Sequence, residues 1–386
     1  MKTLIKNVRI ITPNEVLDNF GIVIEEGKIE DIVCEDDIDI YNIKNIIDGD
    51  GQYLAPGFVD IHNHGNSGFD IMDSTEEALD EMGRYHISKG ITSYLGTIIT
   101  SSYEDMEKAA ENIVKYKNKE DIAEIIGIHL EGPFFNTNKK GAQPDKYIKL
   151  PDKEYIKRLL KLTSNNLKMV SLAPELEGAI DIIRLLKDNN IVVSIAHSDA
   201  NYNEAKKGIE NGITVATHLY NGMKGFSHRE PGAVGAALTD DRVYCEIIYD
   251  RFHLHDIAVK IALDMKGYDK IVLISDAMMA AGLEEGEYLL GGQKVFVKDG
   301  KPRLETGGIA GSTLNLQKAV YNMVNYLQVP IHEAVKMASL NPSRSINMDK
   351  DIGSIERGKK ADLILFDEEI NIKDVYLGGK LVWKEN

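Results

Sequence analysis

The sequence predicts an α/β fold, a (β/α)8 barrel joined to a small β-sandwich domain that is formed from both termini. Eight apolar runs of strand length alternate with amphipathic helical stretches through the middle of the chain. Short strands and turns occupy the two ends, and polar residues suited to catalysis end several of the middle runs. The 386 residues are enough for a barrel, which takes about 250 residues, and for one smaller domain.

The two ends of the chain share a strand-and-turn texture. Residues Thr3–Ile11, 21–25 and Lys28–Cys34 are predicted to be short strands of an antiparallel sheet. The same texture returns in the apolar run Leu363–Phe366 and in a hairpin over residues 374–383. We therefore expect residues 1–54 and 346–386 to form the small β domain and residues 55–345 to form the barrel.

The middle of the chain alternates predicted strands and helices. Segments such as 103–116 and 152–162 carry helical periodicity, and alternation of this kind implies parallel strands with crossover helices. Barrel enzymes place their active sites at the carboxyl ends of such strands. The eight strand-like runs cover residues 58–62, 92–97, 125–130, 168–173, 191–197, 214–219, 244–249 and 271–276.

Histidines and one glutamate end four of these runs. His62 and His64 are two residues apart on a strand, so both imidazoles point to one side. Glu131 ends the third run, and His197 and His218 end the fifth and sixth. Each histidine alone could equally be a core residue or part of a hydrogen-bonded pair. Together with a carboxylate they match the ligand set of a catalytic Zn2+ site, and we predict a metal centre.

Asp276 ends the eighth run. A carboxylate beside a metal can accept a proton from a water molecule that the metal activates, and can then pass that proton on. The alternative role is a helix N-cap, because Asp commonly precedes a helix. With the other ligands nearby, we predict that Asp276 is catalytic.

Composition excludes several classes of function. Asp and Glu number 61 against 45 Lys and Arg, which gives a net charge of −16. Nucleic acids and anionic membranes require a clustered basic surface, so neither is an expected partner. The N-terminus lacks the apolar stretch of a signal peptide, and Cys34 and Cys245 are expected to be free thiols. We expect a cytoplasmic protein, although its acidity argues at first sight against an anionic substrate.

Several motifs resemble the amidohydrolase superfamily and, within it, the family of N-acetylglucosamine-6-phosphate deacetylases. The resemblance spans nearly the whole chain. The His-x-His pair marks only the superfamily, whereas Thr-His-Leu-Tyr-Asn-Gly-Met and Arg-Glu-Pro-Gly are specific to the deacetylases. The segments that carry the resemblance are residues 55–65, 129–134, 140–144, 217–223, 229–232, 275–277 and 310–312.

The resemblance implies hydrolysis of N-acetyl-D-glucosamine 6-phosphate to D-glucosamine 6-phosphate and acetate, a step of amino-sugar catabolism. Glu131, His197 and His218 would hold the principal divalent metal, with Zn2+ favoured and Fe2+, Mn2+ or Co2+ as alternatives. His62 and His64, with Glu131 as a bridge, would allow a second ion, and the choice between one ion and two stays open. Asp276 would be the proton shuttle.

The resemblance also implies the substrate contacts. Asn221 and Gly222 would meet the phosphate, and Arg229 would reach it from a neighbouring subunit of a homodimer. Two positions depart from the family pattern: Gln143 stands where some members have His, and Arg251 stands where Gly is usual. The full set of expected substrate-binding residues is Ala142, Gln143, Asn221, Gly222, Arg229, Asp250, Arg251, Phe252, His253, Ile309, Ala310 and Gly311.

Three alternative functions follow from the same residues. The substrate could be the galactosamine 6-phosphate epimer, which the sequence does not distinguish. A cyclic amidohydrolase would need a lysine at the end of the fourth strand, but Lys168 lies at the opposite end of that run. A metal-free scaffold on the same barrel would have lost one or more ligands, whereas this set is complete.

Overall fold

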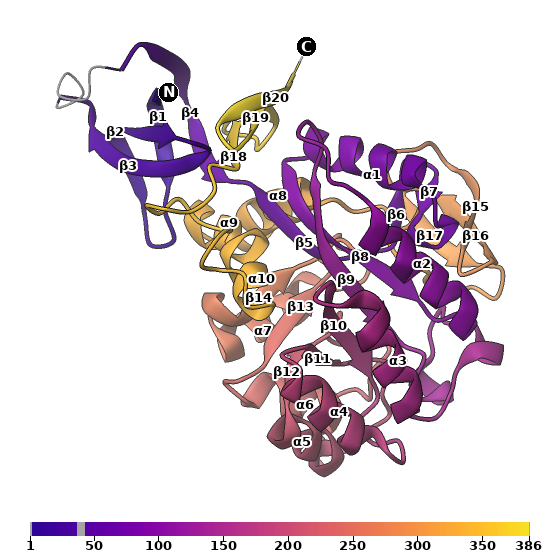
Figure 1. Ribbon diagram of the computed structural model, residues 1–386. Helices are drawn as coiled ribbons and strands as arrows, with labels where there is room; N and C mark the ends of the chain where they lie inside the picture. Colours follow the sequence, from indigo (N-terminus) through magenta and orange to yellow (C-terminus); the bar gives the residue numbers. More distant parts are fainter. Residues whose placement is uncertain (1, 37–42, 386) are drawn as a thin grey trace.

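The computed structural model describes residues 2–36 and 43–385 and contains an eight-stranded parallel barrel (Figure 1). Each predicted apolar run overlaps one barrel strand, so the predicted (β/α)8 fold is confirmed. Neighbouring strands pair in the order β14-β13-β12-β11-β10-β9-β8-β5. Their bounds are β5 Phe58–Asn63, β8 Ile91–Ile99, β9 Glu124–Glu131, β10 Leu167–Leu172, β11 Val192–Ile195, β12 Ile213–Ala216, β13 Tyr244–Ile247 and β14 Ile271–Leu273.

The barrel closes between its first and last strands, β5 and β14. The closing contacts lie just beyond β14, where the Asp276 amide donates to the His62 carbonyl at 2.9 Å and the His64 amide donates to the Ala277 carbonyl at 2.9 Å. His62, His64 and Asp276 therefore lie at the junction between the first and last strands, which we call the seam of the barrel.

Helices cover the outside of the barrel (Figure 1). Helix α3 is typical: the Asp152 side chain caps its first turn, and Tyr155, Ile156 and Leu159 are buried. The two segments named above for helical periodicity are α2 and α3. The helices are α1 Glu76–Ser88, α2 Tyr103–Lys115, α3 Lys153–Thr163, α4 Ala179–Asp188, α5 Tyr202–Asn211, α6 Gly232–Thr239, α7 Asp256–Lys266, α8 Leu316–Leu327, α9 Ile331–Ala338 and α10 Leu340–Ser345.

Both ends of the chain enter one seven-stranded sheet, as expected for the small β domain. Strand β4 lies between β1, which it pairs with in parallel, and β18, which it pairs with antiparallel. The proposed boundary after residue 54 stays a prediction. Strand β4 runs past this boundary to Pro56. The sheet order is β20-β19-β18-β4-β1-β2-β3, with bounds β1 Thr3–Ile11, β2 Val16–Glu25, β3 Lys28–Cys34, β4 Asn45–Pro56, β18 Leu363–Phe366, β19 Ile372–Leu377 and β20 Lys380–Lys384.

A three-stranded antiparallel sheet, which the sequence analysis did not predict, follows β14. It consists of β15 (Gly286–Leu290), β16 (Gln293–Lys298) and β17 (Lys301–Leu304). Gly291 and Gly292 form the β15–β16 turn at φ of +57° and +75°, where glycine is favoured. Its buried side chains join Ile99 of the barrel in one apolar cluster. Among the described residues, no helix is long and apolar enough to cross a membrane.

Candidate metal centre and substrate cavity

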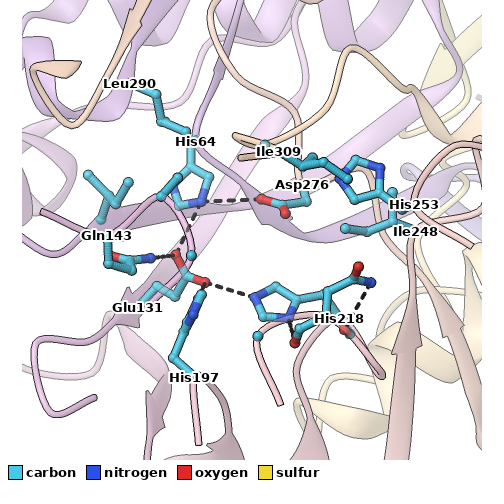
Figure 2. Close-up of a pocket in the computed structure, with 16 residues that line it drawn as sticks. His64, Glu131, Gln143, His197, His218, Ile248, His253, Asp276, Leu290 and Ile309 are labelled. Atoms are coloured by element: carbon cyan, nitrogen blue, oxygen red, sulfur yellow. Dashed lines mark hydrogen bonds and ion pairs between the residues drawn. The ribbon is translucent and has the colours of Figure 1, made fainter. Parts of the chain in front are cut away.

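The six residues predicted for metal chemistry meet at the carboxyl ends of the barrel strands. Figure 2 shows five of them, His64, Glu131, His197, His218 and Asp276. All are buried, with at most 8% of each residue exposed. In each of two groups of three, the potential ligand atoms lie within 4.8 Å of one another. The groups are His62, His64 and Asp276, and Glu131, His197 and His218.

The backbone aims three of these side chains over the barrel mouth. His197, His218 and Asp276 adopt positive φ values of 44°, 32° and 48° directly after their strands. A non-glycine residue in this region is strained by about 1–3 kcal/mol, and such strain commonly marks functional sites. Gly222 packs against this arrangement, because a Cβ there would lie 2.8 Å from His197 Nδ1.

Hydrogen bonds fix the tautomers of the four histidines. Each Nδ1 atom lies within 3.2 Å of an oxygen that only accepts, so Nδ1 keeps its proton, and Nε2 points to the centre of the cluster, where it presents a lone pair whenever the ring is neutral. The acceptors are the Glu246 carboxylate for His62, and the carbonyls of Thr97 for His64, Lys139 for His197 and Asn221 for His218.

These Nε2 atoms face carboxylate oxygens. His197 Nε2 and His218 Nε2 both lie 3.3 Å from Glu131 Oε1, and His64 Nε2 lies 3.3 Å from Asp276 Oδ1. His62 Nε2 is buried and has no hydrogen-bond partner among the described residues. Lone pairs that converge in this way repel one another unless a cation lies between them. The nitrogen and oxygen donors match those that bind divalent transition metals, so the residues fit the predicted metal.

The two carboxylates make the cluster attractive to cations. Burial lowers the pKa of His62, but Asp276 and Glu131 outweigh burial and raise that pKa to about 9. Burial also raises the pKa of Glu131, yet His197 and His218 outweigh it and hold the pKa well below its usual range. Glu131 is therefore ionised in this setting, and positive charge beside it is stabilised.

Two further side chains orient the ligands. Gln143 Nε2 donates to Glu131 Oε2 at 2.7 Å, and the Thr100 amide donates to Gln143 Oε1 at 3.1 Å (Figure 2). Glu246 on β13 is fully buried, and its Oε2 accepts from His62 Nδ1 at 3.2 Å and from the His218 amide at 3.3 Å. The sequence analysis did not identify Glu246, although a single acidic residue within the apolar run 244–249 was a usable signal.

A cavity of about 260 Å³ opens directly onto this cluster. His64, Glu131, His197, His218 and Asp276 line it. Ile99, Ile248 and Leu290 add apolar surface. The expected substrate-binding residues that also line it are Ala142, Gln143, Asn221, Gly222, His253, Ile309 and Gly311.

His253 is held in place by its neighbour Asp250. Asp250 Oδ1 accepts from the amides of Phe252 and His253, each at 2.8 Å, and Asp250 Oδ2 lies 2.7 Å from His253 Nδ1. The His253 side chain therefore points into the cavity from a tight turn. Asp250 reaches the cavity only through this contact.

The other expected substrate residues lie away from the cavity. Arg251 forms an ion pair with Asp256 at 3.1 Å and stacks over Tyr326, with its guanidinium carbon 3.7 Å from the ring centroid. Ala310 is fully buried in the cluster beneath the three-stranded sheet, and Arg229 is exposed to solvent. A separate cavity of about 340 Å³ is lined by residues that include Asp250, Arg251 and Phe252.

Comparison with known proteins gives consistent matches. A family model described as the amidohydrolase family matches residues 53–382. The N-acetylglucosamine-6-phosphate deacetylase of Lysinibacillus sphaericus is 35% identical over 382 residues, which cover 99% of this chain and 98% of that protein. The N-acetylgalactosamine-6-phosphate deacetylase of Escherichia coli O157:H7 is also 35% identical, with 99% of each chain covered. The crystal structure of N-acetylglucosamine-6-phosphate deacetylase from Pasteurella multocida superposes with a TM-score of 0.92 at 31% identity and covers 99% of both chains.

Proposed function

The chain belongs to the amidohydrolase family, and from this membership we propose that it hydrolyses N-acetyl-D-glucosamine 6-phosphate to D-glucosamine 6-phosphate and acetate. It is similar over nearly its whole length to enzymes named for this reaction. One observation carries the proposal: a buried centre of six potential ligands opens into the same cavity as Asn221 and His253. In this proposal the reactive centre and the site for the sugar phosphate share one cavity.

The metal would be held by the two groups of ligands. Glu131, His197 and His218 would bind one divalent cation, and His62, His64 and Asp276 offer a second position beside it. We favour Zn2+ over Fe2+, Mn2+ and Co2+ as the metal. The proposal allows either one ion or two. A bound cation would lower the pKa of a water molecule and polarise the acetyl oxygen.

Asp276 would move the proton. Water attacks the acetyl carbon, the carbon–nitrogen bond breaks, and the departing nitrogen must gain a proton because an amide anion is a very poor leaving group. Burial raises the pKa of Asp276, but His62 and His64 outweigh burial and lower it below its usual value, which keeps the carboxylate ready to accept a proton. The same carboxyl group then donates that proton to the amine.

Recognition of the phosphate is local. Asn221, Gly222 and His253 line the cavity, and Figure 2 shows His253 on the side away from Gln143 and Leu290. The net charge of −16 acts on solubility and long-range steering, whereas a phosphate is bound by a few nearby donors. An acidic protein can therefore bind an anionic sugar phosphate.

Arg229 would complete the phosphate site in the neighbouring subunit of a homodimer. Its side chain is exposed and forms no ion pair within residues 2–36 and 43–385. A second copy also has an apolar surface to cover, because Ile257, Ile261 and Met265 of α7 are 57%, 49% and 53% exposed at four-residue spacing. Both features support a dimer in which each cavity receives an arginine from its partner.

The galacto epimer is a second candidate substrate, since the glucosamine and galactosamine relatives are equally similar at 35% identity. The test is acetate release from N-acetylglucosamine 6-phosphate, from its galacto epimer and from the unphosphorylated sugar. We expect the gluco phosphate to react fastest, in a reaction that a chelator stops and added Zn2+ restores. Equal rates with and without phosphate would reject the roles of Asn221 and Arg229. A cytoplasmic location belongs to the same proposal, because sugar phosphates do not cross membranes unaided.

A further inference from the structure

The end of the cavity that faces away from His253 carries apolar side chains beside Gln143, whose amide is bonded to Glu131. Figure 2 shows Leu290 and Gln143 at one end of the cavity and His253 and Ile248 at the other, with the ligand cluster between them. A sugar phosphate bound with its phosphate toward His253 and its amide at the cluster must direct its acyl chain toward Leu290. Ile99 and Ala142 line the cavity together with Leu290, so the acyl chain would end against hydrocarbon.

A second cavity of about 710 Å³ adjoins this end. Ile99 lines both cavities, whereas Leu290 lines only the first and its neighbours Leu289 and Gly291 line only the second. The barrier between the two spaces therefore includes Ile99 and the tip of the β15–β16 hairpin. The loop of residues 140–144 also contributes, since Ala142 and Gln143 line the first cavity and Pro144 lines the second.

The barrier is held firmly in place. Ile99 and Leu290 are 1% and 2% exposed and belong to one buried cluster. The hairpin tip packs onto the barrel, because a Cβ on Gly291 would lie 3.4 Å from Ile99 Cδ1. Gln293 Nε2 donates to the Ala142 carbonyl at 2.5 Å and ties the hairpin to the loop that carries Gln143.

We propose that Ile99 and Leu290 determine acyl-chain length, restricting the enzyme to N-acetyl groups and excluding longer N-acyl groups. The inference rests on the proposed deacetylase function and goes beyond it by naming the residues that select the acyl group. Extra methylene groups would press against fixed side chains, and overpacking of this kind is unfavourable. A pocket of this kind discriminates about 10–200-fold per methylene group. Longer acyl groups would undergo the same reaction, in which water supplies hydroxyl to the acyl carbon and a proton to the amine.

The test is a chain-length series with Ile99→Ala and Leu290→Ala. We would measure kcat/KM for the N-acetyl, N-propionyl and N-butyryl forms of glucosamine 6-phosphate. For the wild type we expect a fall of at least about 10-fold per added methylene group. In each variant the butyryl-to-acetyl ratio should rise at least about 10-fold, because the truncated side chain opens the cavity toward the space behind it.

Ile248→Ala is the matched control. It removes the same atoms as Ile99→Ala from a buried residue, but at the His253 end of the cavity (Figure 2). Its butyryl-to-acetyl ratio should remain that of the wild type. Melting temperature and bound metal would be measured for all variants. If Ile99→Ala does not fold, Leu290→Ala still tests the inference, because Leu290 lies at the tip of a hairpin and not within a barrel strand.

The outcomes separate this inference from the function on which it rests. Unchanged ratios in the folded variants, or an equal shift in Ile248→Ala, would overturn the acyl-length inference alone. A wild type that hydrolyses all three substrates equally well would also overturn it alone. A wild type that hydrolyses none of them would overturn the proposed function, and the inference would fail with it.

Discussion

The metal centre and the phosphate end of the substrate cavity are built in different ways. At the metal centre, the ligands lie on or directly after barrel strands, are at most 8% exposed, and each histidine has a fixed hydrogen-bond acceptor. At the phosphate end, Asn221 and Gly222 are partly exposed loop residues, and Arg229, which our proposal supplies from a partner, is exposed. The barrel strands thus fix the positions of the metal ligands. Phosphate recognition, in contrast, depends on loops and, in our proposal, on a second subunit. The following predictions test this division.

Replacing Asp276 with Asn should affect only the chemical step. We expect kcat to fall by about 10²–10⁴-fold, because an amide cannot accept the proton from water. KM and the metal bound by Glu131, His197 and His218 should stay close to the wild-type values, since Asp276 is not one of these ligands and its side-chain shape is kept. Steady-state kinetics and metal analysis on the same sample check this expectation, and near-normal turnover would refute the shuttle role.

Replacing Arg229 with Ala should affect only recognition. A hydrogen bond to a charged group contributes about 1.5–3 kcal/mol, so kcat/KM for the phosphorylated substrate should fall about 10–100-fold. The slow reaction of the unphosphorylated sugar should not change. Mixing this variant with Asp276→Asn should restore activity, because a hybrid dimer then has one site with both an intact Asp276 and a partner arginine. No recovery in confirmed hybrids would place Arg229 in its own subunit's site or outside both.

Replacing Glu246 with Gln should weaken cation binding at the metal centre without changing recognition of the phosphate. Loss of the carboxylate acceptor for His62 should reduce affinity for a cation at the His62, His64 and Asp276 position by about 10–100-fold, as measured by chelator competition. Glu175→Gln is the control, since Glu175 accepts from Ser198 Oγ and the Asp199 amide and touches no histidine side chain. Equal weakening in both variants would show a general effect of charge.

Replacing Asp240 with Asn, outside the cavity, should give the smallest effect. The Arg242 side chain, with Lys206, holds the pKa of Asp240 below its usual range. A lowered pKa adds stability above the unfolded-state value of about 3.9, and this stability is lost as pH falls through the folded value. Because Arg242 is exposed and Lys206 is partly exposed, we expect the variant to lose about 1 kcal/mol at pH 7, a difference that shrinks toward acid pH. Denaturant unfolding measures it, and deacetylation should not change.

The residues that could be predicted from the sequence share one property. His62, Glu131, His197 and Asp276 each end an apolar run, and in a parallel barrel all such positions converge at one mouth. Sequence spacing therefore carried three-dimensional information. Period-two alternation likewise placed His62 and His64 on the same side of one strand.

Other features depend on contacts that sequence spacing does not contain. Glu246 contacts His62 across 184 residues, so its place in an apolar run could mark Glu246 as unusual but could not identify His62 as its partner. Most side chains of β15 and β16 are exposed, so no long apolar run in the sequence indicates the β15–β17 sheet. Arg251 adopts a positive φ of 64° and pairs with Asp256, five residues later, which turns it away from the cavity. Ile99 and Leu290 have the character of ordinary core residues, and only the two adjoining cavities distinguish them.

The seam of the barrel gives the metal position a mechanical role. His62 and His64 belong to the first barrel strand and its end, Asp276 follows the last, and backbone hydrogen bonds between these segments complete the circle. A cation held by the three side chains would link the first and last barrel strands, which are more than 200 residues apart in sequence. Loss of the ion should therefore loosen this one junction first, and hydrogen exchange should quicken at the amides of His64 and Asp276 before it does elsewhere in the barrel.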